Sequence, residues 1–299
     1  MNTEAYTERL FECNAAGGQV CRGIITDPLD LPVRKTLVCF PAGIKYRTGP
    51  GGLHVHLART LARFGVSTVR LDVPPLGECE GTLENARVQE IWNTIEQGRF
   101  IEDGCESLLA LSKLTGRGKF HLTGLCGGAA TAQMIAACDP ELVEGLIQFN
   151  PAVTLSQVPG RQTQAIGGAE AKANLSSYLT RLASPQSWAR ALGGISDYRS
   201  MMSTLQMIMK SSGSNEGMQL SPFYKQALET TLQKGIRHLF IMSGNDQRWF
   251  QFQDLVLKLP LEGNFEVHVI PGANHELHWP EWRVSAEQKI AEWLGVETS

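Results

Sequence analysis

A cysteine flanked by glycines is the residue best placed in this chain to act as a nucleophile. Cys126 stands within Gly124-Leu125-Cys126-Gly127-Gly128, after the apolar run 119–123 and before the small, apolar segment 129–138. This pattern predicts a strand, a tight turn that presents the cysteine, and a helix. Glycines let the strand and the helix approach closely, and the amino end of a helix favours a thiolate. Taken alone, the five residues fit equally well a tight turn that carries an inert, buried cysteine.

A thiol nucleophile needs a base, the base needs an acid that orients it, and the sequence supplies both further along. Asp246 follows the strand-like run 236–242, and His275 follows a second such run over 265–270. Both residues therefore come just past the carboxyl end of a strand, where α/β sheets place their ligands. Alone, each has a commoner role: a helix cap or turn for Asp246, and an ordinary loop position for His275. Together and in this order, they predict a Cys126–His275–Asp246 triad.

An acyl-transfer site also needs two backbone N–H donors for the developing oxyanion. One is expected at Gly127, directly after the nucleophile, and the other in the loop after the strand-like run 36–40. Gly43 and Ile44 are the candidates in that loop, and the sequence does not choose between them. Arg47, in the same loop, could contact an anionic group of the substrate or hold the loop to an acidic neighbour.

Strand-like and helical segments alternate around these residues. An antiparallel hairpin is expected over 9–14 and 19–26. Further strands are expected over 36–40, 66–72, 119–123, 143–149, 236–242 and 265–270, and helices over 53–64, 92–114 and 129–138. This alternation predicts an α/β protein with a mainly parallel sheet and helices on both faces.

The stretch 158–235 interrupts the alternation and divides the core into a first part, 1–157, and a second part, 236–299. Its edges are rich in Ser, Gln and Gly and it carries helical pieces, so we expect a helical cap over the active site. Methionines recur at near-helical spacing over 198–210, and Met202 is a candidate to line an acyl pocket. Packing of the cap against the core is the commoner role for such residues.

These features resemble the α/β-hydrolase superfamily over nearly the whole chain. The Gly-Leu-Cys-Gly-Gly elbow is similar to that of dienelactone hydrolases, which also use a Cys–Asp–His triad. The segments 43–50 (GIKYRTGP) and 57–66 (LARTLARFGV) resemble serine-aminopeptidase-like bacterial hydrolases that occur beside biosynthetic genes. The resemblance implies the α/β-hydrolase fold, with a mainly parallel eight-stranded sheet and a helical cap insertion. Dienelactone hydrolases lack the long insertion, so their substrate is not carried over.

A thioester formed on Cys126 stays reactive towards water, amines, alcohols and thiols, so hydrolysis and acyl transfer are both open. We expect a thioesterase or acyltransferase of a biosynthetic pathway that acts on an acyl thioester or ester, with CoA or an acyl carrier protein as candidate carriers. The second interpretation is a dienelactone-type hydrolase of a lactone. The third is a non-catalytic ligand-binding protein on the same scaffold. The sequence specifies neither the acyl group nor the acceptor, and it leaves the oligomeric state open.

Composition narrows the expected partners and location. The net charge is −3 and no basic stripe is present, which argues against nucleic acid. No apolar run reaches the length of a membrane span, and the first residues lack the features of a secretory signal. Seven cysteines without a C-x-x-C pair fit a reducing cytoplasm, where we expect the protein to act.

Neither a metal nor a cofactor is expected. His54 and His56 fall in a predicted helix, where side chains two positions apart diverge, and no Walker-type phosphate loop is present. Cys79 follows the strand-like run 66–72 and is a candidate second reactive thiol. We interpret it as a bystander, because no partner histidine follows it at a helix start.

Overall fold

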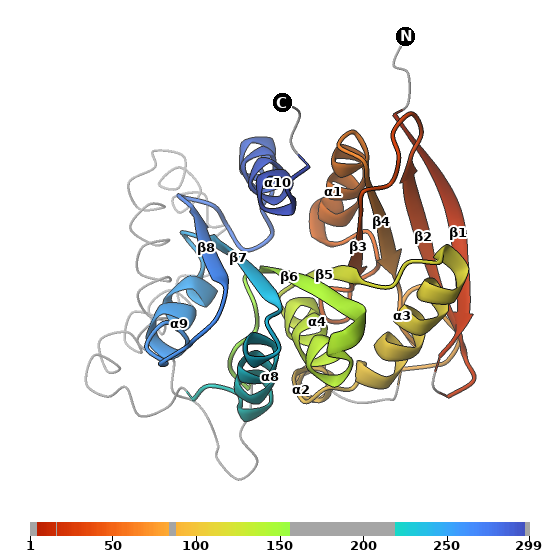
Figure 1. The fold of residues 1–299 in the computed structure, drawn as a ribbon. Helices are drawn as coiled ribbons and strands as arrows, with labels where there is room; N and C mark the ends of the chain where they lie inside the picture. Colours follow the sequence, from red (N-terminus) through yellow and green to blue (C-terminus); the bar gives the residue numbers. More distant parts are fainter. Residues whose placement is uncertain (1–4, 16, 84–87, 156–218, 297–299) are drawn as a thin grey trace, which may run out of the picture.

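The computed structural model describes residues 5–15, 17–83, 88–155 and 219–296, which build one sheet with helices on both faces (Figure 1). The strand order is β1-β2-β4-β3-β5-β6-β7-β8. β2 is antiparallel to both β1 and β4, and the other neighbouring strands are parallel. The strands are β1 (Tyr6–Asn14), β2 (Val20–Pro28), β3 (Lys35–Phe40), β4 (Val66–Leu71), β5 (Phe120–Leu125), β6 (Val143–Phe149), β7 (Arg237–Ser243) and β8 (Phe265–Ile270). The predicted mainly parallel, eight-stranded sheet is confirmed.

Alternating side chains along β3 divide the core between the two faces of the sheet. Leu37 and Cys39 belong to the hydrophobic cluster that includes side chains of α1 (Leu53–Ala62) and α10 (Pro280–Leu294). Val38 and Phe40 belong to a second cluster, with side chains of α3 (Ile101–Thr115). The other helices are α2 (Val88–Glu96), α4 (Gly127–Cys138), α8 (Pro222–Gln233) and α9 (Gln247–Leu255). Because both faces are covered, the central strand β5 is buried along its whole length.

The helix predicted over 92–114 is two helices in the structure, α2 and α3. Between them lies Gly98, whose φ of 100° belongs to a region that side chains rarely allow. A Cβ at this position would lie 2.6 Å from Cδ1 of Ile101. The prediction of one helix is therefore wrong at this point, because apolar periodicity continues across a turn that a single glycine sets.

A chain of buried polar side chains fixes α8 to the sheet. Tyr224 donates its hydroxyl proton to Oε1 of Gln148 (2.8 Å), and Nε2 of Gln148 donates to Oε1 of Gln133 (2.9 Å). Gln133 in turn donates to Oγ1 of Thr231 (2.8 Å), which lies 3.0 Å from Nε2 of His238. Since each member has a partner, the network holds β6, β7, α4 and α8 in one arrangement.

The chain leaves the sheet after β6 and returns to the same place before α8. Thr154 and Leu220 form an antiparallel bridge, and the backbone N–H of Ser221 donates to the carbonyl of Val153 (2.8 Å). Residues 156–218, most of the predicted cap with Met202, lie outside the described residues. The cap and the boundaries at 157/158 and 235/236 therefore stay predictions.

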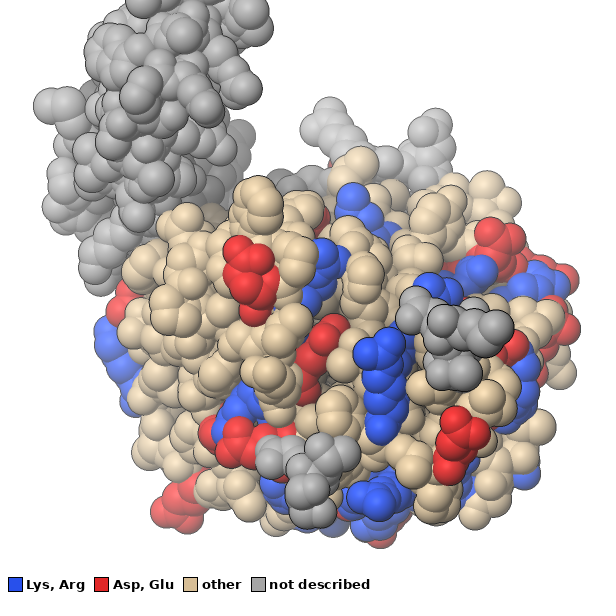
Figure 2. Space-filling view, turned by 90° about the horizontal axis from the view of Figure 1, so that it is seen from above, with Lys and Arg blue, Asp and Glu red and all other residues tan. Residues whose placement is uncertain are grey.

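Charged side chains of both signs are interspersed on the face shown in Figure 2, and neither sign forms a continuous patch there. Within the described residues, no helix is both long and apolar enough to cross a membrane. The same residues contain no group of three His, Cys, Asp or Glu side chains arranged to hold a metal ion.

Candidate active site

Cys126 occupies the sharp turn between β5 and α4, as the glycine pattern predicts. Its φ of 56° and ψ of −114° are unusual for a residue with a side chain. The turn needs glycines nearby: a Cβ on Gly124 would lie 2.4 Å from the backbone carbon of Gly128. A Cβ on Gly128 would lie 2.4 Å from the carbonyl oxygen of Pro41. The close approach of β3, β5 and α4 therefore positions the thiol at the start of α4.

His275 and Asp246 lie together at the carboxyl end of the sheet, beside Cys126. Nδ1 of His275 and Oδ2 of Asp246 are 2.5 Å apart, and the other carboxylate oxygen accepts the backbone N–H of Arg248 (3.2 Å) at the start of α9. The His275 ring also hydrogen-bonds the Cys126 thiol. The structure thus brings the three predicted residues into the order of a catalytic triad.

Burial lowers the pKa of His275, but the hydrogen bonds and negative charges of Asp246 and Cys126 outweigh burial and raise it to about 10. Burial raises the pKa of the Cys126 thiol, whereas the positive charges of Arg248 and His275 lower it by more, so its net shift is downward. Both shifts favour a thiolate beside an imidazolium at neutral pH.

Arg248 is a site residue that the sequence analysis missed. It lies in the first turn of α9, lines the cavity over Cys126, and donates from Nη1 to Oε1 of Gln251 (3.2 Å). Burial lowers its pKa, but the negative charges of Cys126 and Glu96 raise it by more. The available signal was its place two residues after the acid. No sequence motif, however, indicates that a charged residue at position 248 turns towards Cys126.

Asn150, directly after the predicted strand 143–149, positions the histidine loop and is a second site residue that the sequence pattern did not single out. Its φ of 42° is one that asparagine tolerates better than most residues. Its Nδ2 donates to the carbonyl of His275 (2.9 Å) and to Oγ of Ser243 (2.8 Å), while its Oδ1 accepts the N–H of Ser243 (2.7 Å). One buried amide thereby connects β6 and β7 to the loop that carries His275.

A cavity of about 300 Å³ opens onto the triad. Both apolar and charged side chains line it, and the charges are of both signs. The lining residues are Ala42, Lys45, Pro50, Trp92, Glu96, Leu125, Cys126, Arg248, His275 and Glu276. The cavity is therefore able to hold a small acyl group with polar substituents.

Trp92 packs across the two glycines expected to bind the oxyanion. A Cβ on Gly43 would lie 2.0 Å from Cη2 of this indole, and a Cβ on Gly127 would lie 2.9 Å from its Cζ3. A Cβ on Gly127 would also lie 3.5 Å from the backbone nitrogen of Gly43, so the two residues are neighbours. Ile44 packs its side chain against a separate apolar cluster that includes Ile91 and Ile95 of α2.

Arg47 holds its loop against the sheet. Its backbone N–H donates to Oδ1 of Asp72 (2.7 Å), and its guanidinium forms an ion pair with the other oxygen of that buried carboxylate. Of the two roles open from the sequence, the structure shows contact with an acidic neighbour. Arg47 is not among the described residues that line the cavity, and its candidate role in substrate binding stays a prediction.

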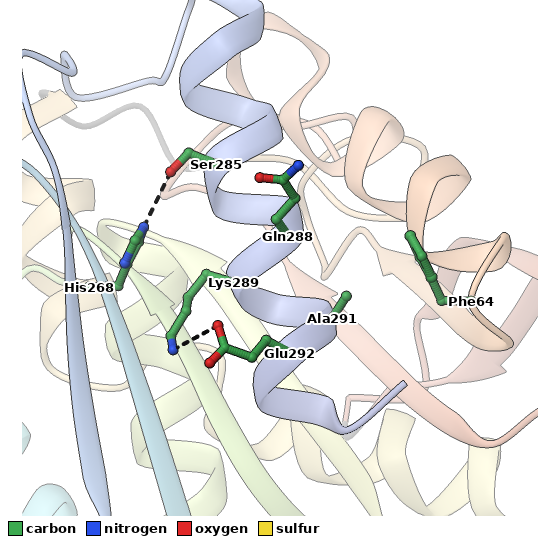
Figure 3. Close-up of a pocket in the computed structure, with 7 residues that line it drawn as sticks. All are labelled: Phe64, His268, Ser285, Gln288, Lys289, Ala291 and Glu292. Atoms are coloured by element: carbon green, nitrogen blue, oxygen red, sulfur yellow. Dashed lines mark hydrogen bonds and ion pairs between the residues drawn. The ribbon is translucent and has the colours of Figure 1, made fainter. Parts of the chain in front are cut away.

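A larger cavity, of about 410 Å³, lies against α10 and β8 (Figure 3). In it, Oγ of Ser285 and Nε2 of His268 are 3.3 Å apart. Ser285 lies inside a regular helix, and no carboxylate among the described residues hydrogen-bonds His268. Glu266 and Glu292 instead pair with Lys289 (2.5 and 3.1 Å). Without an orienting acid or a strained turn, this cavity lacks the features that single out Cys126.

No family model matches the sequence, and no relative was found among curated proteins. Solved structures are similar in fold. Dienelactone hydrolase from Anabaena variabilis superposes with a TM-score of 0.59 at 14% identity, over 99% of this chain and 100% of that one. DcsB, in complex with its substrate analogue, superposes with a TM-score of 0.61 at 16% identity, over 98% of this chain and 100% of that one. XC6422 from Xanthomonas campestris, an α/β serine hydrolase without a lid, superposes with a TM-score of 0.53 at 14% identity, over 100% of this chain and 99% of that one.

The strand order, the helices on both faces and these similarities define an α/β-hydrolase fold. The resemblance to dienelactone hydrolase expected from the elbow is confirmed as a likeness of fold. At these identities the likeness extends to the fold alone.

Proposed function

We propose that this protein is a cysteine-dependent enzyme that forms an acyl-enzyme on Cys126 from a thioester or ester. The observation that supports this most directly is the strained turn at Cys126 beside the His275–Asp246 pair. A fold shared with hydrolases and esterases agrees with it.

The first half of the reaction uses the thiolate as the attacking atom. The Cys126 sulfur adds to the substrate carbonyl, and the N–H groups of Gly127 and Gly43 stabilise the oxyanion. His275, as imidazolium, then protonates the leaving thiol or alcohol, which leaves a thioester on the enzyme. Asp246 holds the ring through Nδ1 and stabilises its charge.

The second half releases the acyl group. Neutral His275 takes a proton from water or from an acceptor nucleophile, which attacks the thioester and regenerates the Cys126 thiolate. The acyl-enzyme of a cysteine is more activated than that of a serine, so transfer to an amine, alcohol or thiol competes with hydrolysis. A thioesterase or acyltransferase of a biosynthetic pathway, with CoA or an acyl carrier protein as donor, is the form we favour.

Hydrolysis of a lactone is the second candidate, because a dienelactone hydrolase is among the structures with this fold. The chemistry on Cys126 is the same, except that the leaving alcohol stays attached to the acyl group. Opening of a lactone therefore yields an adduct with the mass of the whole substrate. A thioester instead transfers only its acyl portion.

Intact-mass measurement with a panel of acyl thioesters, esters and lactones tests the proposal. We expect a mass gain of acyl or lactone size in the wild type and in Cys79→Ala, and none in Cys126→Ala. Cys79→Ala is the matched control, because it removes a half-buried thiol outside the site. An adduct that survives in Cys126→Ala would refute this nucleophile. Ligand binding that is equal in both proteins, without any adduct or turnover, would favour a binding protein.

A further inference from the structure

Three cysteines lie close together near the β1–β2 edge of the sheet, away from the triad. Cys13 on β1 and Cys21 on β2 are direct cross-strand partners in the hairpin. Cys79, in the loop after β4, accepts the backbone N–H of Arg22, the residue after Cys21 (3.2 Å), and the Cys21 thiol donates to the carbonyl of Asp72 (2.9 Å). Cys21 is buried, whereas Cys13 and Cys79 are half-buried and reachable by small solutes.

The geometry of Cys13 and Cys21 suits a disulfide. Directly opposed residues of an antiparallel pair have Cα atoms about 4.5–5.5 Å apart, inside the range of about 4.4–6.8 Å that disulfides span. Both sulfurs face Oγ of Ser107, at 3.7 Å from Cys13 and 3.4 Å from Cys21, so they lie on the same side of the hairpin. Bond formation therefore requires side-chain rotation and no change in strand register.

The pKa values of Cys13 and Cys79 are lowered and that of Cys21 is raised, so the register of the hairpin, and not acidity, selects Cys13 as the partner of Cys21. The hydrogen bond with Cys21 lowers the pKa of Cys13 to about 7, although burial opposes this change. Hydrogen bonds with Cys13 and Cys79, together with burial, raise the pKa of Cys21. Cys21 therefore stays a thiol, and Cys13 is a thiolate in part at neutral pH.

We propose that Cys13 and Cys21 form a site of reversible oxidation by hydroperoxides. The Cys13 thiolate attacks one peroxide oxygen, the O–O bond breaks, and Cys13 becomes a sulfenic acid while hydroxide takes up a proton to leave as water. The Cys21 sulfur then attacks the Cys13 sulfur, and the sulfenic oxygen leaves as a second water. The two thiols lose two electrons in total, which reduce one hydrogen peroxide to two waters.

The chain itself makes this site easy to follow. Trypsin cleaves after Arg9 and Arg22, so both cysteines fall in one peptide, 10–22, whereas Cys79 falls in the peptide 71–87. The experiment uses the full chain as Cys126→Ala, which removes the catalytic thiol. The protein is treated with hydrogen peroxide, blocked with N-ethylmaleimide and digested without reductant.

We expect peptide 10–22 to lose both maleimide labels, to become two hydrogens lighter than its reduced form, and to recover its labels after dithiothreitol. Adding Cys21→Ser should stop the reaction at a sulfenic acid on Cys13 that dimedone traps. Adding Cys79→Ser should leave the disulfide unchanged. Cys105 serves as an internal control that should keep its maleimide label, because burial raises its pKa to about 12.

Two results would overturn the proposal. In the first, peptide 10–22 keeps both maleimide labels at peroxide concentrations that oxidise the exposed Cys138. Alternatively, peptide 10–22 could be found joined to peptide 71–87, which would make Cys79 the partner of Cys21.

Discussion

Replacing Gly128 by alanine tests whether close approach of β3 and α4 positions the nucleophile. The new Cβ would lie 2.4 Å from the carbonyl oxygen of Pro41 and 2.8 Å from that of Phe40. Both are backbone atoms at the end of β3, so no side chain can rotate away. The shorter distance falls about 1 Å below ordinary van der Waals contact, and α4 must move by about that amount.

The size of the effect follows from this displacement. An alanine in a helix normally gains about 0.5–1 kcal/mol over glycine, whereas overpacking of this kind costs about 1–3 kcal/mol or more. We therefore expect Gly128→Ala to lower the free energy of unfolding by about 1–2 kcal/mol. Because Cys126 and Gly127 move with the helix, acylation should slow by about a hundredfold, the usual consequence of misplacing reacting groups by 1 Å.

Two other glycines provide matched controls. A Cβ on Gly118 meets nothing within 4 Å, so Gly118→Ala should leave stability and acylation unchanged. Gly116 ends α3 with a φ of 67° and open space around it, so Gly116→Ala should cost about 1 kcal/mol of stability through backbone strain alone. Denaturant unfolding and the acylation rate measure both quantities. If Gly128→Ala behaves like Gly118→Ala in both, the steric argument for the elbow is refuted.

Three further predictions concern the site and its support. Arg248→Met should raise the pKa of the Cys126 thiol and slow its alkylation by iodoacetamide at pH 6 by about tenfold. Arg248→Lys keeps the positive charge and should retain most of the rate. Equal rates in the wild type and both variants would exclude an effect of the Arg248 charge on the thiol. Because the pKa of His275 is raised to about 10 from an ordinary 6.5, its pairing with Asp246 stabilises the fold fully below about pH 6.5 and loses this effect as pH rises through 10. The stability difference between wild type and Asp246→Asn, measured in denaturant, should therefore shrink over that window, and a constant difference would contradict it. Tyr224→Phe should cost about 1–2 kcal/mol in the same assay by leaving Gln148 short of a donor, and no loss would show that the network is not stabilising.

The parts of the fold that depend on local pattern could be predicted from the sequence. The strands over 143–149 and 265–270 match β6 and β8 residue for residue, because apolar runs bounded by turn residues specify both strand and limits. The convergence of Cys126, Asp246 and His275 was predictable for a related reason: parallel strands bring their carboxyl ends to one edge, so three separate strand ends meet.

The parts that depend on packing between distant segments could not be predicted. Arg248 reaches the cavity because α9 packs against β7, and nothing in its neighbours in sequence distinguishes it from a solvated arginine. Trp92 was expected only to begin a helix, yet the turn at Gly98 places its indole over Gly43. The role of Arg47 was left open for the same reason, since Asp72 belongs to the end of another strand.

The bridge between Thr154 and Leu220 brings together the two points at which the described core is interrupted. Two residues bridged in this way lie about 5 Å apart, a gap that a two-residue turn closes in ordinary hairpins. The sheet, the triad and both of its supporting loops are encoded entirely on either side of this junction. The gene could therefore gain, lose or exchange the segment as a cassette without a change in the catalytic order of cysteine, acid and histidine.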